Sequence, residues 1–295
     1  MSRPVFLHYD QKALDDAYDQ SVYAPNRDQV LARRERTSAL ARQRLGEPAR
    51  FAYGESANEQ LDVYRTRAAD APVNVFIHGG AWRAGRARDY AAAAEMFVGA
   101  GAHCVVLDFD DVDAAGGDLS VLAQQVRRAV AWVRKNAERF GGDPERLYVS
   151  GTSSGAHLGG VVAITDWRKD YELPPDTVKG YTLCSGMYDL RGPRLSKRSA
   201  YVKFTDEMEA GLSPQRHLER IGAPVTLLYG SQESPEFKRQ SEEFAAALKA
   251  AGKTVELILA HGYNHFELQE TLASPDGAMG RAVLRQMGST ERRHS

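Results

Sequence analysis

A short motif of glycine and serine is the first place where the sequence offers reactive chemistry. The residues GTSSG at positions 151–155 directly follow an apolar run of strand length and directly precede a helical pattern. A G-x-S-x-G motif in this context is typical of a nucleophile elbow, a turn so tight that only glycine is tolerated two residues either side of the serine. We therefore predict that Ser153 is a nucleophile, presented at a helix N-terminus. The alternative is a glycine- and serine-containing loop that only caps a helix.

A second glycine-containing motif, HGGAW at residues 78–82, lies at the end of an earlier apolar run. Attack by a serine on a carbonyl creates an oxyanion, which must be stabilised by hydrogen-bond donors that are already in position. Two glycines after a strand leave backbone N–H groups exposed, and the amide of the residue after the nucleophile completes the set. The predicted oxyanion hole therefore consists of the amides of Gly79, Gly80 and Ser154. His78 is expected to order this loop.

A serine hydroxyl is a poor nucleophile until a base removes its proton, so a histidine and an orienting carboxylate are also required. After a nucleophile elbow these residues follow in the order serine, acid, histidine, each in a loop behind a late strand. Glu233 lies four residues beyond one apolar run, and His265 lies in the loop behind the next. We predict Glu233 as the acid and His265 as the base. Two alternatives stay open, Glu236 as the acid and His261 as the base.

Other side chains near these motifs are weaker candidates. Four aromatic residues would suit a pocket for an aromatic or small apolar group, although core packing explains each of them equally well: Trp82, Tyr188, Phe204 and Phe266. His157 is expected to pack or to form a pocket wall. Three arginines follow the glycine loop, and one of them could steer a substrate carboxylate: Arg83, Arg86 and Arg88.

No metal or cofactor site is predicted. The acidic stretch 108–118 lacks the glycine and glutamate that a calcium-binding EF-hand loop needs at its sixth and twelfth positions. His261 and His265 are spaced as a helical metal-binding pair would be, but Gly262 and Asn264 between them favour a loop. Phosphate-binding glycine motifs are absent from the sequence.

These motifs must be positioned by an alternation of short apolar runs and longer helical patterns. The runs are expected to be strands covered on both faces: Val73–Ile77, His103–Leu107, Leu147–Ser150, Gly180–Cys184, Val225–Tyr229 and Val255–Leu259. The helical patterns lie between them: Tyr90–Val98, Val121–Arg139, Gly155–Ile164 and Glu236–Ala250. This alternation predicts an α/β fold with a mostly parallel central sheet and helices on both faces. Two weaker runs are expected to be antiparallel edge strands: Arg50–Gly54 and Leu61–Thr66.

The 295 residues are expected to form a single domain. Residues 1–48 form a helical N-terminal cap in this prediction, residues 191–214 an irregular insertion at the rim, and residues 288–295 a disordered tail. The net charge is −1, which argues against a nucleic-acid partner and against attraction to anionic membranes. With two cysteines and no apolar segment of membrane-spanning length, a cytoplasmic protein is expected. A homodimer remains open.

Several stretches of the chain, between about residues 50 and 285, resemble the α/β-hydrolase superfamily. The resemblance rests on the HGGAW and GTSSG motifs, together with SGMYDL at 185–190, LSP at 212–214, YGSQESPEFKRQSEEF at 229–244 and NHFE at 264–267. The branch that they resemble is shared by hormone-sensitive-lipase-like esterases and kynurenine formamidases, and the SPEFxxQS pattern favours the formamidase side. Many relatives have aspartate at position 233, a different loop at 108–113, and other residues beside the nucleophile, where this chain has Thr152 and Ser154.

The resemblance and the motifs together predict a serine hydrolase without a cofactor, acting on a small molecule through an acyl-enzyme. A small, aromatic formamide or ester is the expected substrate, with a short-chain carboxylesterase as the alternative. A more distant alternative is a non-catalytic small-molecule binder on the same fold, but the histidine at the expected position argues against it. The cap and the insertion at 191–214 are expected to lie above Ser153 and to select substrates by size.

Overall fold

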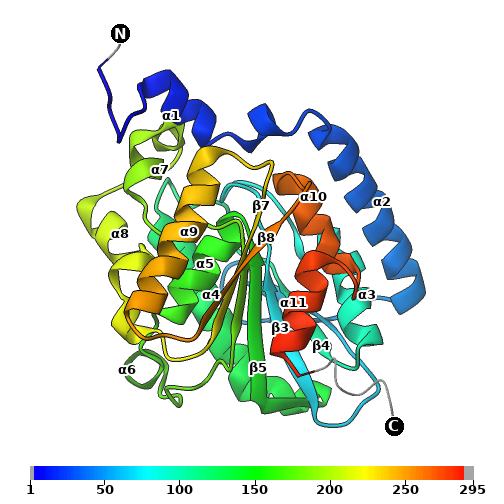
Figure 1. The fold of residues 1–295 in the computed structure, drawn as a ribbon. Coiled ribbons are helices and arrows are strands. Elements are labelled where there is room, and N and C mark those ends of the chain that lie inside the picture. The colour runs from blue at the N-terminus through cyan, green and yellow to red at the C-terminus, as the bar shows by residue number, and fades with distance from the viewer. Residues whose placement is uncertain (1–2, 289–295) are drawn as a thin grey trace.

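The structure, a computed structural model, describes residues 3–288, and every strand in that range belongs to one eight-stranded sheet (Figure 1). The strands are β1 (Ala49–Ala52), β2 (Gln60–Tyr64), β3 (Ala71–Ile77), β4 (His103–Leu107), β5 (Gly142–Thr152), β6 (Tyr181–Cys184), β7 (Val225–Gly230) and β8 (Val255–Ala260). Their order across the sheet is β1-β2-β4-β3-β5-β6-β7-β8. The nucleophile motif at the end of β5 therefore lies near the middle of the sheet.

The sheet is mostly parallel, as predicted. From β4 to β8 all neighbours run parallel, whereas β1 and β2 pair antiparallel and β2 joins β4 antiparallel. One expectation is wrong: β8 was expected to be covered on both faces, but it is the far edge of the sheet, and Leu257 and Leu259 are exposed. A run of apolar residues reports strand propensity, but it does not tell which strand ends the sheet.

Eleven α-helices occur in the described range: α1 (Gln11–Ala17), α2 (Arg27–Leu45), α3 (Ala91–Gly99), α4 (Leu119–Asn136), α5 (Ser154–Ala163), α6 (Trp167–Tyr171), α7 (Arg191–Leu195), α8 (Asp206–Gly211), α9 (Pro235–Ala250), α10 (His265–Glu270) and α11 (Ala278–Gln286). Short 3-10 helices connect several of them, at Gln20–Tyr23, Ala87–Tyr90, Ala137–Phe140, Lys197–Ala200, Pro214–Arg216, Leu218–Arg220 and Thr271–Ala273. The N-termini of α4 and α9 are capped by side chains. Asp118 accepts the amide of Ser120 at the start of α4, and Ser234 precedes Pro235 at the start of α9.

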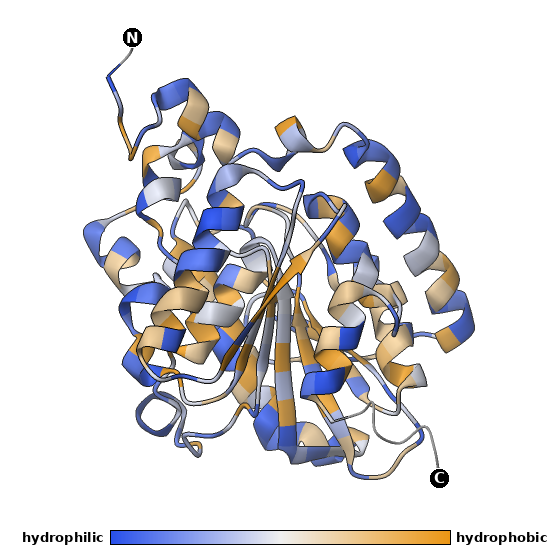
Figure 2. Cartoon of the chain, in the orientation of Figure 1, coloured by the Kyte–Doolittle hydropathy of each residue, from blue (hydrophilic) through white to orange (hydrophobic). Residues whose placement is uncertain are grey.

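Helices cover both faces of the sheet, as predicted, and each face has its own apolar core. Successive residues of a strand point to opposite faces. Val75 and Ile77 of β3 therefore pack with α4, α5 and α9, whereas Phe76 packs with α3 and α11 on the other side. In Figure 2 hydrophobic colour is concentrated on the central strands, whereas the outer helices carry many hydrophilic residues. Because helices pack on both faces, the carboxyl ends of β3, β5, β6 and β7 are held side by side at one end of the sheet.

The N-terminal segment runs over that end of the sheet. Residues 3–48 contain α1 and α2, and α2 packs along α3 (Figure 1). The segment 191–214 was expected to be irregular, but it contains the short helices α7 and α8. Apart from Gly288, the expected disordered tail lies outside the described residues. None of the helices found between residues 3 and 288 has the length and apolar character needed to cross a membrane. That the whole chain forms one domain stays a prediction.

Candidate active site

Ser153 occupies the sharp turn between β5 and α5. Its φ of 55° and ψ of −123° are unusual for a residue other than glycine, and such strain is typical of functional turns. The turn is held by the amide of Ser153, which donates to the carbonyl oxygen of Cys184 at 2.8 Å. A Cβ on Gly155 would lie 2.1 Å from the carbonyl oxygen of Ile77, so only glycine allows α5 to approach β3 this closely. The sequence therefore folds here into the elbow that the GTSSG motif predicts.

The structure brings Ser153, His265 and Glu233 into one line of hydrogen bonds. The hydroxyl of Ser153 is 2.9 Å from Nε2 of His265, and Nδ1 of His265 is 2.9 Å from Oε2 of Glu233. An ionised carboxylate only accepts hydrogen bonds, so Nδ1 of His265 carries the proton, and Nε2 is free to accept the serine proton. All three side chains are buried. The arrangement has the geometry of a nucleophile, a base and an orienting acid.

His265 is the first residue of α10, and its position is set by the preceding residue. The side chain of Asn264 caps the helix by accepting the amides of Phe266 and Glu267, and the Glu267 carboxylate accepts the amide of Asn264 in return. Asn264 also donates to Asn26 at 2.8 Å, which ties this loop to the N-terminal segment. His265 is thus placed by a capped helix end.

Glu233 follows β7, and its other carboxylate oxygen is held by two further donors. Oε1 accepts the amide of Gly230 at 2.7 Å and the hydroxyl of Ser185 at 2.5 Å. Ser185 lies directly after β6 with a φ of 57° and is fully buried. Ser185 was not among the site residues predicted from the sequence. Its only signal there was its position at the start of the SGMYDL motif.

The loop after β3 brings backbone amides up to the nucleophile. A Cβ on Gly79 would lie 2.8 Å from the carbonyl oxygen of Thr152 and 3.0 Å from Cβ of Ser153, so this loop lies against the elbow. Gly79 and Gly80 line the cavity at Ser153, and the amide of Ser154 is the first of α5. Within residues 3–288, no protein atom accepts a hydrogen bond from these three amides. Donors at this place are suited to a negatively charged oxygen.

His78 is buried beneath this loop. Its Nδ1 is 2.9 Å from the carbonyl oxygen of Gly79, and its ring stacks on Phe109 at 4.5 Å and on Tyr90 at 5.6 Å. Burial lowers the pKa of His78, so the ring is neutral at pH 7 and donates from Nδ1. His78 thus contacts Gly79 of the loop and two aromatic rings outside it, and its role in ordering the loop stays a prediction.

Three of the four predicted pocket walls are wrong. Tyr188 is fully buried and stacks on Phe244 at 4.4 Å, and Phe204 packs against the core. The indole of Trp82 donates to Nδ1 of His157 at 3.3 Å, and Trp82 does not line the cavity over Ser153. Phe266 alone of the four lines the cavity at Ser153. The sequence shows where these aromatic residues lie along the chain, but the direction in which each side chain points depends on tertiary packing.

The alternatives that the sequence left open lie elsewhere. His261 is exposed, and it does not line the cavity. Glu236 is fully buried, but its carboxylate is bound by Arg239 at 2.7 Å and by the hydroxyl of Tyr18 at 2.8 Å. None of the three arginines after the glycine loop lines the cavity: Arg83, Arg86 and Arg88. In the loop at 108–118, the carboxylate of the first residue, Asp108, accepts hydrogen bonds from the guanidinium of Arg50 and from the amide of Ala87.

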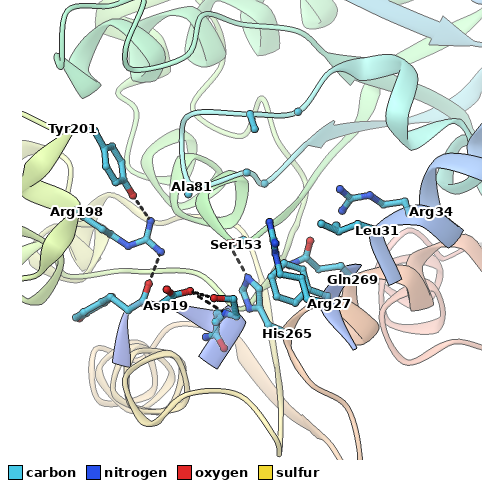
Figure 3. A pocket seen from close by; sticks show the side chains of 18 of the residues that line it. Asp19, Arg27, Leu31, Arg34, Ala81, Ser153, Arg198, Tyr201, His265 and Gln269 are labelled. Atoms are coloured by element: carbon cyan, nitrogen blue, oxygen red, sulfur yellow. Dashed lines mark hydrogen bonds between the residues drawn. The ribbon is translucent and has the colours of Figure 1, made fainter. Parts of the chain in front are cut away.

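A cavity of about 440 Å³ opens over Ser153 (Figure 3). Its floor is formed by the elbow, the glycine loop and His265. Its other walls come from the N-terminal segment and from residues 197–201, the two regions that were expected to lie there: Tyr18, Asp19, Gln20, Ser21, Arg27, Leu31, Arg34, Lys197, Arg198 and Tyr201. The two regions were predicted from the sequence, but the side chains in them that line the cavity were not. Several of these side chains are charged.

Comparison with known proteins finds relatives that cover most of this chain. A family model described as BD-FAE matches residues 61–183. Kynurenine formamidase from Salmo salar is 33% identical over 268 residues, which cover 87% of this chain and 86% of the relative. Kynurenine formamidase from Danio rerio is 32% identical over 245 residues, which cover 81% of each chain.

The fold also has solved counterparts. The crystal structure of esterase LipW from Mycobacterium marinum matches with a TM-score of 0.68 at 20% identity, covering 92% of this chain and 89% of that chain. This likeness identifies the α/β-hydrolase fold, and the identity to the two fish proteins over most of their length identifies the family. The chain is therefore a hydrolase with the α/β-hydrolase fold, and it belongs to the kynurenine formamidase family.

Proposed function

We propose that this protein is a serine hydrolase that cleaves a small aryl formamide or aryl ester through an acyl-enzyme. The observation that carries the proposal is the pair of 2.9 Å contacts that joins Ser153, His265 and Glu233 beside free backbone amides. A catalytic triad and an oxyanion hole are the roles that this arrangement supports best.

In the proposed mechanism, Nε2 of His265 accepts the proton of Ser153 as its oxygen attacks the substrate carbonyl. Glu233 holds the imidazole in the required tautomer and stabilises the imidazolium that forms. The amides of Gly79, Gly80 and Ser154 donate to the tetrahedral oxyanion. His265 then protonates the leaving amine or alcohol, and the acyl group stays on the serine. Water, activated by the same histidine, releases the acid product.

The formamide is favoured over the ester by family membership, and the size of the site suits an aryl group in either class. A cavity of about 440 Å³ accommodates a single aromatic ring with a short substituent. A short-chain carboxylesterase is the second candidate, because the same groups hydrolyse esters by the same steps. A non-catalytic binder would have no need of a histidine held between a serine and a carboxylate.

The test is a comparison of kcat/KM on N-formylkynurenine and on p-nitrophenyl esters of increasing acyl length, with Ser153→Ala as the control. A strong preference for the formamide supports an arylformamidase. Preference for a short ester with a negligible formamide rate supports the carboxylesterase. If neither substrate turned over, or if Ser153→Ala kept the wild-type rate, the proposed triad would be wrong. The cytoplasmic location, the homodimer and the lack of a cofactor stay predictions.

A further inference from the structure

The cavity over Ser153 is rich in positive charge. Four cationic side chains line it: Arg27, Arg34, Lys197 and Arg198. Among its described lining residues Asp19 is the one carboxylate. Two of the cations already have carboxylate partners. Lys197 pairs with Asp19, and Arg27 is 3.1 Å from Asp28 at the surface. The charges that remain are those of Arg34 and Arg198.

Arg198 is the more unusual of the two, because it is only 6% exposed. Its described partners are all neutral. Nη1 donates to the hydroxyl of Tyr201 at 2.8 Å, Nη2 donates to the carbonyl oxygen of Tyr18 at 3.0 Å, and the guanidinium lies 5.4 Å from the ring centre of Trp82. Its Nε is buried without a hydrogen-bond partner. A buried charge is costly unless an opposite charge compensates it. No carboxylate of the described chain contacts this guanidinium, so an anion bound here would compensate its charge.

Arg34 supplies a second cation across the site. It projects from α2, is half-buried, and lies 4.9 Å from the ring centre of Tyr90. Figure 3 shows Arg198 and Tyr201 on one side of Ser153, and Arg34 with Leu31 on the other. Both sides of the nucleophile therefore carry a guanidinium that no carboxylate of the described chain neutralises. The potential in the cavity is positive, which favours the entry of an anion.

We propose that Arg198 is a specificity-determining residue that binds a carboxylate on the substrate. The proposal rests on the proposed hydrolase function and names its substrate class, a formamide or ester whose aryl part carries a free carboxylate. A guanidinium recognises a carboxylate through directed N–H donors, and burial strengthens that contact. Tyr201 and Tyr18 hold the guanidinium in place, and Arg34 attracts the same anion through the field of the cavity.

Binding at Arg198 would also orient the scissile carbonyl. A substrate held at its carboxylate and at its oxyanion has two fixed points, so the carbonyl carbon is presented to Ser153 in one direction. A hydrogen bond from a charged donor in such a site corresponds to about 10- to 100-fold in kcat/KM.

The experiment compares formanilide with 2-, 3- and 4-formamidobenzoate, which differ from it only by a carboxylate. We expect the wild-type protein to prefer at least one formamidobenzoate over formanilide by about 10- to 100-fold in kcat/KM. In Arg198→Met this preference falls to near one, and the readout is the ratio of kcat/KM on the formamidobenzoates to kcat/KM on formanilide. Arg198→Lys, which keeps the charge but loses the planar donors, gives an intermediate ratio. Arg88→Met, which removes a 75% exposed charge outside the cavity, keeps the wild-type ratio.

A purely structural role for Arg198 would lower the rates on all four substrates together and leave their ratio unchanged, and this result would overturn the proposal. A wild-type protein without any preference for the anionic formamides would overturn it as well, whatever the variants do.

A binding measurement separates the proposal from the proposed function. Calorimetry of the formamidobenzoate isomer that the wild-type protein prefers, with Ser153→Ala and with Ser153→Ala combined with Arg198→Met, reports on the anion site without turnover. Affinity that falls about 10-fold or more in the double variant supports the site. Equal affinity rejects it, even if Ser153 proves to be the nucleophile. If Ser153→Ala still hydrolysed the substrates, the proposed function would fail, while the affinity difference would still decide the role of Arg198.

Discussion

The hydroxyl of Ser185 donates a hydrogen bond to Oε1 of Glu233 at 2.5 Å, and the two residues come from turns behind neighbouring strands, β6 and β7. Together with the amide of Gly230, this contact leaves only Oε2 of the carboxylate for His265. The orientation of the Glu233 carboxylate, and through it the tautomer of His265, therefore depends on a residue that makes no hydrogen bond to Ser153.

Replacing Ser185 with alanine should lower kcat by about 10- to 100-fold, because a hydrogen bond to a charged group is lost. The expected change in KM is small, since Ser185 does not line the cavity. Ser150→Ala is the matched control. That buried serine accepts a hydrogen bond from Asn74 at 2.8 Å in the middle of the sheet, so its loss should reduce stability without reducing kcat. An unchanged kcat in Ser185→Ala would show that Glu233 is positioned without it.

The two glutamates behind β7 should separate cleanly in kinetics. Glu233→Gln should lower kcat by roughly 10³- to 10⁴-fold with KM little changed, because an amide can no longer hold the histidine in the required tautomer. Glu236→Gln should leave kcat within a factor of about three. It should reduce the free energy of unfolding by roughly 1–3 kcal/mol, because Arg239 loses a buried partner. Steady-state kinetics and urea unfolding of both variants test this, and the reverse pattern would make Glu236 the acid.

Alanine at Gly79 should damage catalysis more than stability. The added Cβ would lie 2.8 Å from the carbonyl oxygen of Thr152, so the loop must move away from the elbow and take its amide with it. Loss of one oxyanion donor corresponds to about 10²- to 10³-fold in kcat. Overpacking of this kind lowers the free energy of unfolding by about 1–3 kcal/mol.

Gly99→Ala is the control for this substitution, because nothing lies within 4 Å of the Cβ that it would add at the end of α3. It should keep the wild-type kcat and a stability equal to or slightly above that of the wild type. A Gly79→Ala protein with the wild-type kcat would remove its amide from the proposed oxyanion hole.

The positions of the reactive residues were predictable because each is tied to the end of a strand. β3 ends at Ile77, directly before HGGAW, and β5 ends at Thr152, inside GTSSG, and the sheet brings those two ends to one edge. The parallel order also places Glu233 and His265 on that edge, behind β7 and β8. Strand ends and tight turns have strong local signals, so their placement does not require knowledge of the whole fold.

The walls of the cavity were not predictable for the opposite reason. Arg198 and Arg34 lie in polar segments whose helical or irregular character says nothing about which side chain faces inward. Tyr188 shows the converse, an aromatic residue in a family motif that packs against Phe244 in the core. Only the tertiary arrangement of the cap and the insertion over Ser153 decides these directions. The same limit applies to β8, whose edge position depends on what packs beside it.

The last prediction concerns His157, which is fully buried beneath the site and is not part of it. Its Nε2 donates to the carbonyl oxygen of Leu212 at 2.8 Å, and its Nδ1 accepts the indole N–H of Trp82 at 3.3 Å, so the neutral ring satisfies both contacts. Burial is the main cause that lowers the pKa of His157 to about 4, and the nearby guanidinium groups of Arg127 and Arg198 lower it further.

Because the folded protein binds this proton less readily than the unfolded chain, the neutral His157 stabilises the fold fully above pH 6.5, and the contribution is lost as the pH falls toward 4. The linkage amounts to about 2–3 kcal/mol between pH 7 and pH 4.5. His157→Gln can keep one donor and one acceptor but does not titrate. Urea unfolding at both pH values should therefore show a smaller loss of stability in His157→Gln than in the wild type, by that amount. If both proteins lost the same free energy, the ring would be protonated in the folded state, and one of its two hydrogen bonds would have to be broken.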